Sequence, residues 1–186
     1  QIVADELHVH IDDIHVEIGD TAKFPQGVGT VASRVGVNIG TAAFSAATDV
    51  RKKALNLAAE LLGSEYDDLE IEDGIVRDKG KSNITISLGE LALKLAPMSG
   101  GAIPEGHTAS LESTSYDSSK GLAHASGSNV CELEVDTGTG EVKLLNYCVA
   151  HDCGKKINPL IVEGQIIGGV VHGIGNALFE EMIYDD

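Results

Sequence analysis

Tryptophan is absent from this 186-residue chain, and aromatic residues make up only 4% of it. No uninterrupted apolar run reaches 18 residues, which argues against a transmembrane helix. Basic residues are also scarce, at 13 against 29 acidic residues, and the formal net charge is -16. A field of that sign repels nucleic acid and anionic membrane surfaces. We therefore expect neither as a partner.

Cysteine is infrequent, and its spacing excludes several kinds of site. The chain has three cysteines and no C-x-x-C motif, so the usual iron–sulfur and zinc-knuckle spacings are missing from it. An odd number of thiols in a chain of this size is typical of a reduced, cytoplasmic protein. We expect a cytoplasmic location on this basis.

The length predicts one unit over residues 1–186, large enough to bury a core. The first residues, "QIVADEL", have the pattern of a helix already under way, and the last, "EEMIYDD", contain no stop signal. We therefore expect a fragment of a longer polypeptide at both ends.

Hydrophobic periodicity predicts helices and strands mixed along the chain, an α+β fold built from a two-layer mixed sheet and helices. The expected order is a helix end at 1–7, a strand at 14–20, a loop at 21–40, a helix at 41–63, a hairpin at 69–78, a strand entering a helix at 84–96, an irregular segment at 97–128, a hairpin at 129–152 and a Gly-rich apolar helix within 158–182.

Local signals sharpen three of these boundaries. Gly63 stands where a helix C-cap is expected. Asp73 and Gly74 form the pair typical of a type I′ hairpin turn. Ser87 and Glu90 have the spacing of a capping box.

The stretch "LHVHIDDIHVEIGD", residues 7–20, raises the question of a metal site. If it were one strand, His8, His10 and Asp12 would share a face. Imidazole and carboxylate together suit Zn, Mn or Fe. A metal hydrolase using these three residues is one hypothesis, and solvated polar side chains are the other.

Glycine is concentrated in two stretches, "GVGTVASR" at 27–34 and "GQIIGGVVHGIG" at 164–175. Neither matches a Walker A loop or a dinucleotide fingerprint. Each has an ordinary explanation, a surface loop for the first and close helix packing for the second. On the packing reading, another backbone or a ligand lies against a set of helix glycines, and Gly169→Val destabilises the fold by about 2 kcal/mol or more through overpacking. This set is Gly168, Gly169, Gly173 and Gly175.

Longer motifs resemble one enzyme family. Residues 131–181, "CELEVDTGTGEVKLLNYCVAHDCGKKINPLIVEGQIIGGVVHGIGNALFEE", and residues 18–34, "IGDTAKFPQGVGTVASR", closely resemble the molybdenum-cofactor-binding large subunit of the xanthine dehydrogenase, aldehyde oxidase and carbon monoxide dehydrogenase family. The two motifs occur in the family's order. The resemblance implies that the chain is a C-terminal-region fragment of such a subunit, with the fold of its molybdopterin-binding domain.

The resemblance also implies which residues hold the cofactor. Thr30, Val31, Ala32 and Ser33 would lie on a cofactor-contacting loop, and Gln165 would hydrogen-bond the pterin. Arg34 would face a phosphate of the cofactor or form an ion pair. The cytosine dinucleotide form of molybdopterin is left open.

No catalytic residue is expected in the chain, because the family's base is a glutamate in a G-x-G-E motif, here expected downstream of Asp186. The parent enzyme would oxidise a small aldehyde, N-heterocycle or CO-type substrate with water-derived oxygen. Iron–sulfur and FAD groups would lie on other subunits or segments, in a hetero-oligomer. An alternative is an inactive module that serves subunit assembly.

The family pattern gives the histidines a different setting. His8 falls at a helix C-terminus, where a protonated imidazole complements the dipole. Asp12 and Asp13 fall in a turn, and the strand begins near Ile14. Molybdenum takes no side-chain ligand in this family, so the resemblance requires no metal-binding histidine.

Overall fold

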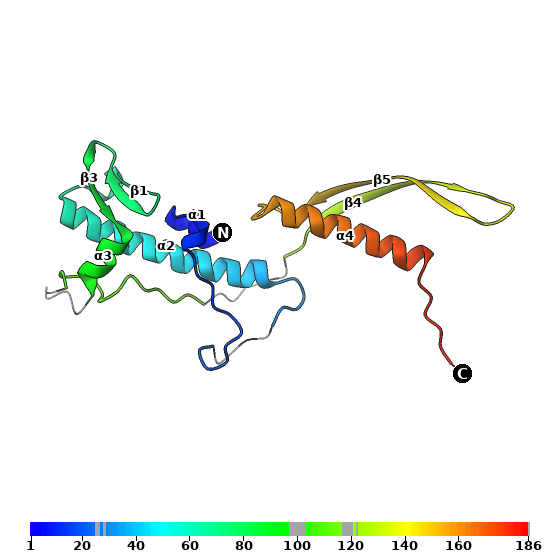
Figure 1. The fold of residues 1–186 in the computed structure, drawn as a ribbon, viewed down its shortest axis with the longest axis horizontal. Helices are drawn as coiled ribbons and strands as arrows, with labels where there is room; N and C mark the ends of the chain where they lie inside the picture. The colour runs from blue at the N-terminus through cyan, green and yellow to red at the C-terminus, as the bar shows by residue number, and fades with distance from the viewer. Residues whose placement is uncertain (25–26, 28, 97–102, 117–120, 122, 186) are drawn as a thin grey trace. The chain divides into compact units, whose positions relative to one another are not determined.

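A computed structural model describes residues 1–24, 27, 29–96, 103–116, 121 and 123–185 (Figure 1). The chain divides into two compact units, Gln1–Gly121 and Leu122–Asp186, where the sequence predicts one. No helix in the described part of the chain is both long and apolar enough to span a bilayer.

Two helices form one side of the first unit. The short helix α1 (Ile2–Leu7) packs on the long helix α2 (Val35–Leu62). A side chain at Gly40 would place its Cβ 3.1 Å from Cδ1 of Ile2, so this glycine gives α1 room to approach. The predicted start of α2 at residue 41 is wrong, because the helix already includes Gly36 and Gly40. Its predicted end is confirmed, with Gly63 left-handed at φ 62° as the C-cap.

A three-stranded antiparallel sheet follows a single 3₁₀ turn at Tyr66–Asp68. Its strands pair in the order β1 (Leu69–Glu72), β2 (Ile75–Asp78) and β3 (Lys81–Ser87). Asp73 and Gly74 both have positive φ, 50° and 71°, which confirms the type I′ turn between β1 and β2.

Helix α3 (Leu88–Leu95) begins at a capping box, as the sequence predicts. The backbone N–H of Glu90 donates to Oγ of Ser87 at 3.1 Å, and the backbone N–H of Ser87 donates to Oε2 of Glu90 at 2.9 Å. The apolar face of α3 then packs on the sheet and α2. The resulting core consists of Ala54, Leu55, Leu57, Ala58, Leu69, Ile71, Val76, Leu91 and Leu95.

One buried carboxylate joins the end of α2 to the sheet. Oδ2 of Asp78 accepts a hydrogen bond from Oγ of Ser64 at 2.5 Å, and its Oδ1 accepts from the backbone N–H of Gly80 at 2.8 Å. The Ser64 hydroxyl is the largest cause that lowers the pKa of Asp78 below its ordinary value. The charged form is therefore the one that the fold stabilises.

The predicted strand at residues 14–20 is wrong. The segment follows a 3₁₀ turn at Ile11–Asp13, has no strand pairing, and leaves Val16 70% and Ile18 81% exposed. Alternation of apolar and polar residues makes a strand only where a partner edge is present, and no described strand pairs here.

The second unit contains a long hairpin and one helix. Strands β4 (Ser126–Val135) and β5 (Val142–Asp152) pair antiparallel, with a register shift at Glu132/Leu133. Asp136 closes the turn, because its Oδ1 accepts from the backbone N–H groups of Gly138 at 2.7 Å and Thr139 at 3.0 Å. This confirms the second predicted hairpin, although β4 begins inside the segment predicted to be irregular. Of that segment, 97–102, 117–120 and 122 lie outside the described residues.

Helix α4 (Pro159–Leu178) begins where the Asn-Pro pair predicts. Oδ1 of Asn158 accepts from the backbone N–H groups of Leu160 at 3.1 Å and Ile161 at 3.3 Å. The helix ends at Leu178, before the predicted limit at 182. Glu180 and Glu181 therefore follow the helix. The α+β class is confirmed, with both sheets antiparallel throughout.

Candidate functional site

The loop before α2 has an unusual backbone. Gly29 has φ 77°, and the non-glycine residues Ala32 and Ser33 have φ 52° and 53°. The backbone N–H of Arg34 donates to the carbonyl of Val31 at 3.4 Å, which closes a turn around these two residues. Positive φ costs about 1–2 kcal/mol for each L-residue with a side chain, so this loop conformation is energetically unfavourable without other support.

The same loop leads directly into the N-terminus of α2. Arg34 is the N-cap residue, and its side chain makes no capping hydrogen bond. Unsatisfied N–H groups and the helix dipole together make such an N-terminus electropositive. Thr30–Ser33 are all exposed beside it. The arrangement suits an anionic or oxygen-rich ligand.

Gln165 lies in the second unit, where a groove of about 500 Å³ runs along α4 and the hairpin. Polar groups reach it from both sides, among them Asn129 and His151 from the strands and Gln165 from the helix. The full lining is Gly127, Asn129, Tyr147, Val149, His151, Cys153, Ile161, Val162, Gln165, Ile166, Gly169, Val170 and Gly173. An amide offers donors and an acceptor, so Gln165 could bind the edge of a heterocycle in this groove.

Glycines widen the helix side of the groove. A Cβ at Gly169 or Gly173 would meet no atom within 4 Å, and the same holds for Gly168. At Gly175 the nearest atom is Oε1 of Glu180, at 3.4 Å. Within the described residues, no backbone outside the helix lies within 4 Å of a Cβ at these four positions. The other half of the prediction, close approach of a ligand, stays a prediction. Gly169 and Gly173 instead leave open space, which a bound group could occupy.

On the strand side, a glycine accommodates an imidazole. A Cβ at Gly127 would lie 3.0 Å from the carbonyl oxygen of Ala150 and 3.2 Å from Nδ1 of His151. His151 is paired with Gly127 in the register of β4 and β5. The sequence motifs do not single out His151, Asn129 and Tyr147 as groove residues. The period-2 pattern of the hairpin carries the signal that could have found them, since Asn129 and Gly127 share a face.

The histidine-rich stretch does not have the geometry of the metal hypothesis. His8 is the left-handed C-cap of α1, at φ 50°, as the resemblance implied. His10 precedes the 3₁₀ turn, and its Nδ1 lies 3.4 Å from Oδ2 of Asp12. The three residues therefore do not share one strand face. Within the described residues, no three His, Cys, Asp or Glu side chains come together in a way that could hold a metal ion.

The family of the chain follows from its similarity to known proteins. The family model described as "Molybdopterin cofactor-binding domain" matches residues 1–186. The chain belongs to this family.

Among relatives, the chain is 36% identical to the nicotine 6-hydroxylase large subunit of Paenarthrobacter nicotinovorans over 187 residues. It is 33% identical to the carbon monoxide dehydrogenase large chain of Hydrogenophaga pseudoflava over 185 residues. All of this chain is covered in both cases, but only 23% and 22% of the relatives. The chain thus spans under a quarter of their length.

Solved structures agree with this assignment. Quinoline 2-oxidoreductase from Pseudomonas putida 86 is matched with a TM-score of 0.84 at 37% identity, over 100% of this chain and 23% of that one. Carbon monoxide dehydrogenase from Oligotropha carboxidovorans is matched with a TM-score of 0.86 at 33% identity, over 99% of this chain and 22% of that one.

The residues predicted to bind cofactor fall into two groups. Thr30–Ser33 are contiguous on one loop of the first unit, and Gln165 belongs to the groove of the second unit. Their role in cofactor binding stays a prediction.

Proposed function

We propose that this chain forms part of the molybdenum-cofactor cradle of a molybdenum hydroxylase large subunit. The observation that carries the proposal is the match of a molybdopterin-binding family model to all 186 residues. The parent enzyme would oxidise a small aldehyde, N-heterocycle or CO-type substrate with water-derived oxygen. The names of the relatives, which include a nicotine hydroxylase, a quinoline oxidoreductase and CO dehydrogenases, support this range.

The residues present fit a pterin cofactor in two places. The exposed residues Thr30–Ser33, beside a helix start that has no side-chain cap, suit oxygen ligands or phosphate. The groove at Gln165 has free space over Gly169 and Gly173 and an amide that can donate and accept. The bound molybdenum cofactor would supply the redox chemistry, and these residues would hold and orient it. The proposed cofactor is molybdopterin, either without a nucleotide or as its cytosine dinucleotide.

Within the proposal, no residue of this chain abstracts a proton. The catalytic base would be a glutamate located beyond Asp186 in the parent subunit. Glu180 and Glu181 are exposed in the segment after α4, outside the groove lining. This geometry supports a binding role for the chain rather than a catalytic one.

The partners follow from the same proposal. The first is the remainder of its own large subunit, and the others are subunits carrying iron–sulfur clusters and FAD, in a cytoplasmic hetero-oligomer. Relatives named "large subunit" and "complex subunit gamma" are parts of larger assemblies.

The test is a substitution at Gln165 in the full-length large subunit. Gln165→Ala removes one polar partner of the pterin, an interaction of about 1–3 kcal/mol, so we expect cofactor affinity to fall about tenfold or more. Molybdenum and pterin content of the purified subunit, followed during dialysis, measures this. Asn176→Ala is the matched control, because it removes an amide from the same helix outside the groove lining. Equal cofactor retention in both variants would contradict the assigned role of Gln165.

A further inference from the structure

Helix α4 has a second apolar surface, separate from the side that lines the groove. Its residues recur alternately four and three positions apart, which places them along one line of the helix. We call this line the back stripe, and it consists of Leu160, Gly164, Ile167, Val171, Ile174 and Leu178.

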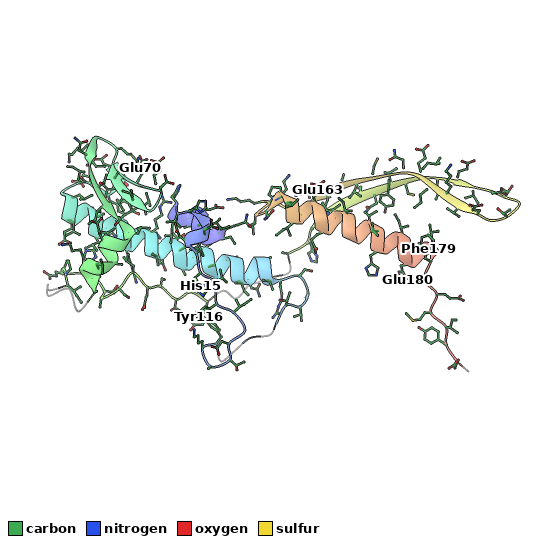
Figure 2. All side chains as sticks on the ribbon, in the orientation of Figure 1. His15, Glu70, Tyr116, Glu163, Phe179 and Glu180 are labelled. Atoms are coloured by element: carbon green, nitrogen blue, oxygen red, sulfur yellow. The ribbon has the colours of Figure 1, made fainter. Side chains whose placement is uncertain are left out.

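Most of the back stripe is exposed, with Leu160, Ile167 and Val171 at 78%, 55% and 61%, although Ile174 is half-buried. On the groove side, Val162, Ile166 and Val170 are half-buried and Ile161 is 61% exposed. Figure 2 shows side chains projecting around α4, with Glu163 near its start and Phe179 just after its end.

Leaving this stripe in water is unfavourable. Each fully exposed Leu, Ile or Val forgoes about 1.5–3 kcal/mol of burial. Glu163 is the single Asp, Glu, Lys or Arg in the 20 residues of α4. A helix that is apolar on opposite sides is typical of a protein interior. The stripe therefore requires a covering partner.

We propose that the back stripe packs against a helix in the part of its own large subunit that lies outside residues 1–186. This inference rests on the proposed function. The chain spans only 22–23% of the length of its relatives, so most of such a subunit is available as the partner. Spacing of four and three residues is the pattern of helices that cross at a shallow angle, and Gly164 within the stripe permits close approach.

Charge disfavours a second copy of this chain as the occupant. From residue 122 onward the sequence has ten acidic and three basic residues. Each copy has a formal net charge of -16, so two copies meeting through the nearly uncharged α4 would still repel each other. A segment of the same subunit is not subject to this constraint.

The experiment uses photo-crosslinking in the full-length large subunit. A benzophenone amino acid replaces Val171 in one variant and Asn176 in a control, and crosslinked peptides are mapped by mass spectrometry. We expect Val171 to crosslink to one helical segment outside residues 1–186, at least fivefold more than Asn176 does. Crosslinks within residues 1–121, crosslinks between differently isotope-labelled copies, or no crosslink above the control would each overturn the proposal.

A substitution gives a second readout that does not depend on the probe. Val171→Glu buries an unpaired charge in the proposed contact, so we expect the yield of folded full-length subunit to fall at least tenfold. Asn176→Glu adds the same charge to the same helix about 140° around from Val171, and a yield equal to that of Val171→Glu would overturn the proposal. Both readouts are taken with and without cofactor. Pterin loss in Gln165→Ala without a Val171 crosslink would refute this inference alone, whereas a Val171 crosslink with pterin retained in Gln165→Ala would refute the proposed function alone.

Discussion

Asp78 shows how a single carboxylate links stability to pH in this chain. The Ser64 hydroxyl is the largest cause that lowers its folded-state pKa; burial, the second-largest cause, raises it, and the Gly80 amide and Lys81 lower it further. Because the folded pKa lies below the unfolded value of about 3.9, the stabilisation is complete above that value. It is lost as the pH falls through the folded pKa.

We therefore expect Asp78→Asn to reduce the acid sensitivity of the fold. Urea unfolding at pH 6 and pH 3 measures it, and the wild-type midpoint should fall further between the two than the variant's midpoint. Ser64→Ala should give an intermediate result, since it removes only the leading hydrogen bond. Glu90 and Asp136 also have lowered pKa values, so some acid sensitivity should remain. Identical shifts in wild type and Asp78→Asn would contradict the assignment.

Gly74 combines a positive φ with two backbone hydrogen bonds to other elements of the first unit. Its φ is 71°, its N–H donates to the carbonyl of His8, and its carbonyl accepts from the N–H of Leu88, both at 2.9 Å. It thus connects α1, the β1–β2 turn and the start of α3.

Substitution of Gly74 by alanine should destabilise the chain by about 1–2 kcal/mol, because an L-residue is strained at this φ. The new Cβ would also lie 3.4 Å from Cγ1 of Val9. Gly89→Ala is the control, since it is helical with open space around it and should be neutral or stabilising by up to about 1 kcal/mol. Chemical denaturation compares the two, and equal effects would refute the claim.

At the scale of the element, the open space around α4 changes the effect expected of substitutions at Gly169. The sequence predicts that Gly169→Val overpacks, but no atom lies within 4 Å of a Cβ at this position. For the isolated chain we now expect Gly169→Ala to be neutral or to stabilise by about 0.5–1 kcal/mol, through helix propensity alone.

In the full-length subunit the same Gly169→Ala substitution should lower cofactor content, because the methyl group enters the groove beside Gln165. Thermal unfolding of the isolated chain and pterin content of the subunit give the two values. Gly168→Ala serves as the control, since Gly168 is not among the groove-lining residues. A loss of stability in the isolated chain would mean that something of this chain does pack there.

Elements encoded by local hydrogen bonds were predictable from the sequence. The capping box at Ser87, the turn at Asp73–Gly74 and the C-cap at Gly63 each depend on residues within a few positions, so the sequence shows all of the interaction. The prediction of a strand at 14–20 failed because strand pairing depends on the edge of another strand, which the alternation of apolar and polar residues does not reveal. The predicted start of α2 was wrong because glycines usually disfavour a helix, whereas here Gly40 lies inside the helix and makes room for Ile2.

The candidate site also has a part that the sequence predicts and a part that it does not. A sequence motif identifies Gln165, whereas the groove around it, including His151, can be recognised only once the strand register of the hairpin is known. The positive φ of Ala32 and Ser33 carries no sequence signal, since neither residue type favours it. Strain of this kind is maintained only when surroundings compensate, and we expect those surroundings in the parent subunit.

At the scale of the whole molecule, the contrast between the two units decides what the chain can do alone. The first unit has a buried core around Leu57, Val76 and Leu91. In the second, no described residue is buried. Thr30–Ser33 and Gln165 lie on different units, so each unit offers only part of the proposed cradle.

The last prediction is therefore that the isolated chain binds no molybdopterin and turns over no aldehyde, N-heterocycle or CO substrate. Each unmet polar contact of the cofactor costs about 1–3 kcal/mol, and the chain spans under a quarter of its relatives. The proton-abstracting glutamate is also expected outside it. The first unit should still fold, which its cooperative thermal unfolding would show. Molybdenum and pterin content, with dye-linked oxidation of the three substrate classes, completes the measurement. Stoichiometric cofactor with turnover would show that the groove at Gln165 and the loop at Thr30–Ser33 suffice without the remainder of the subunit.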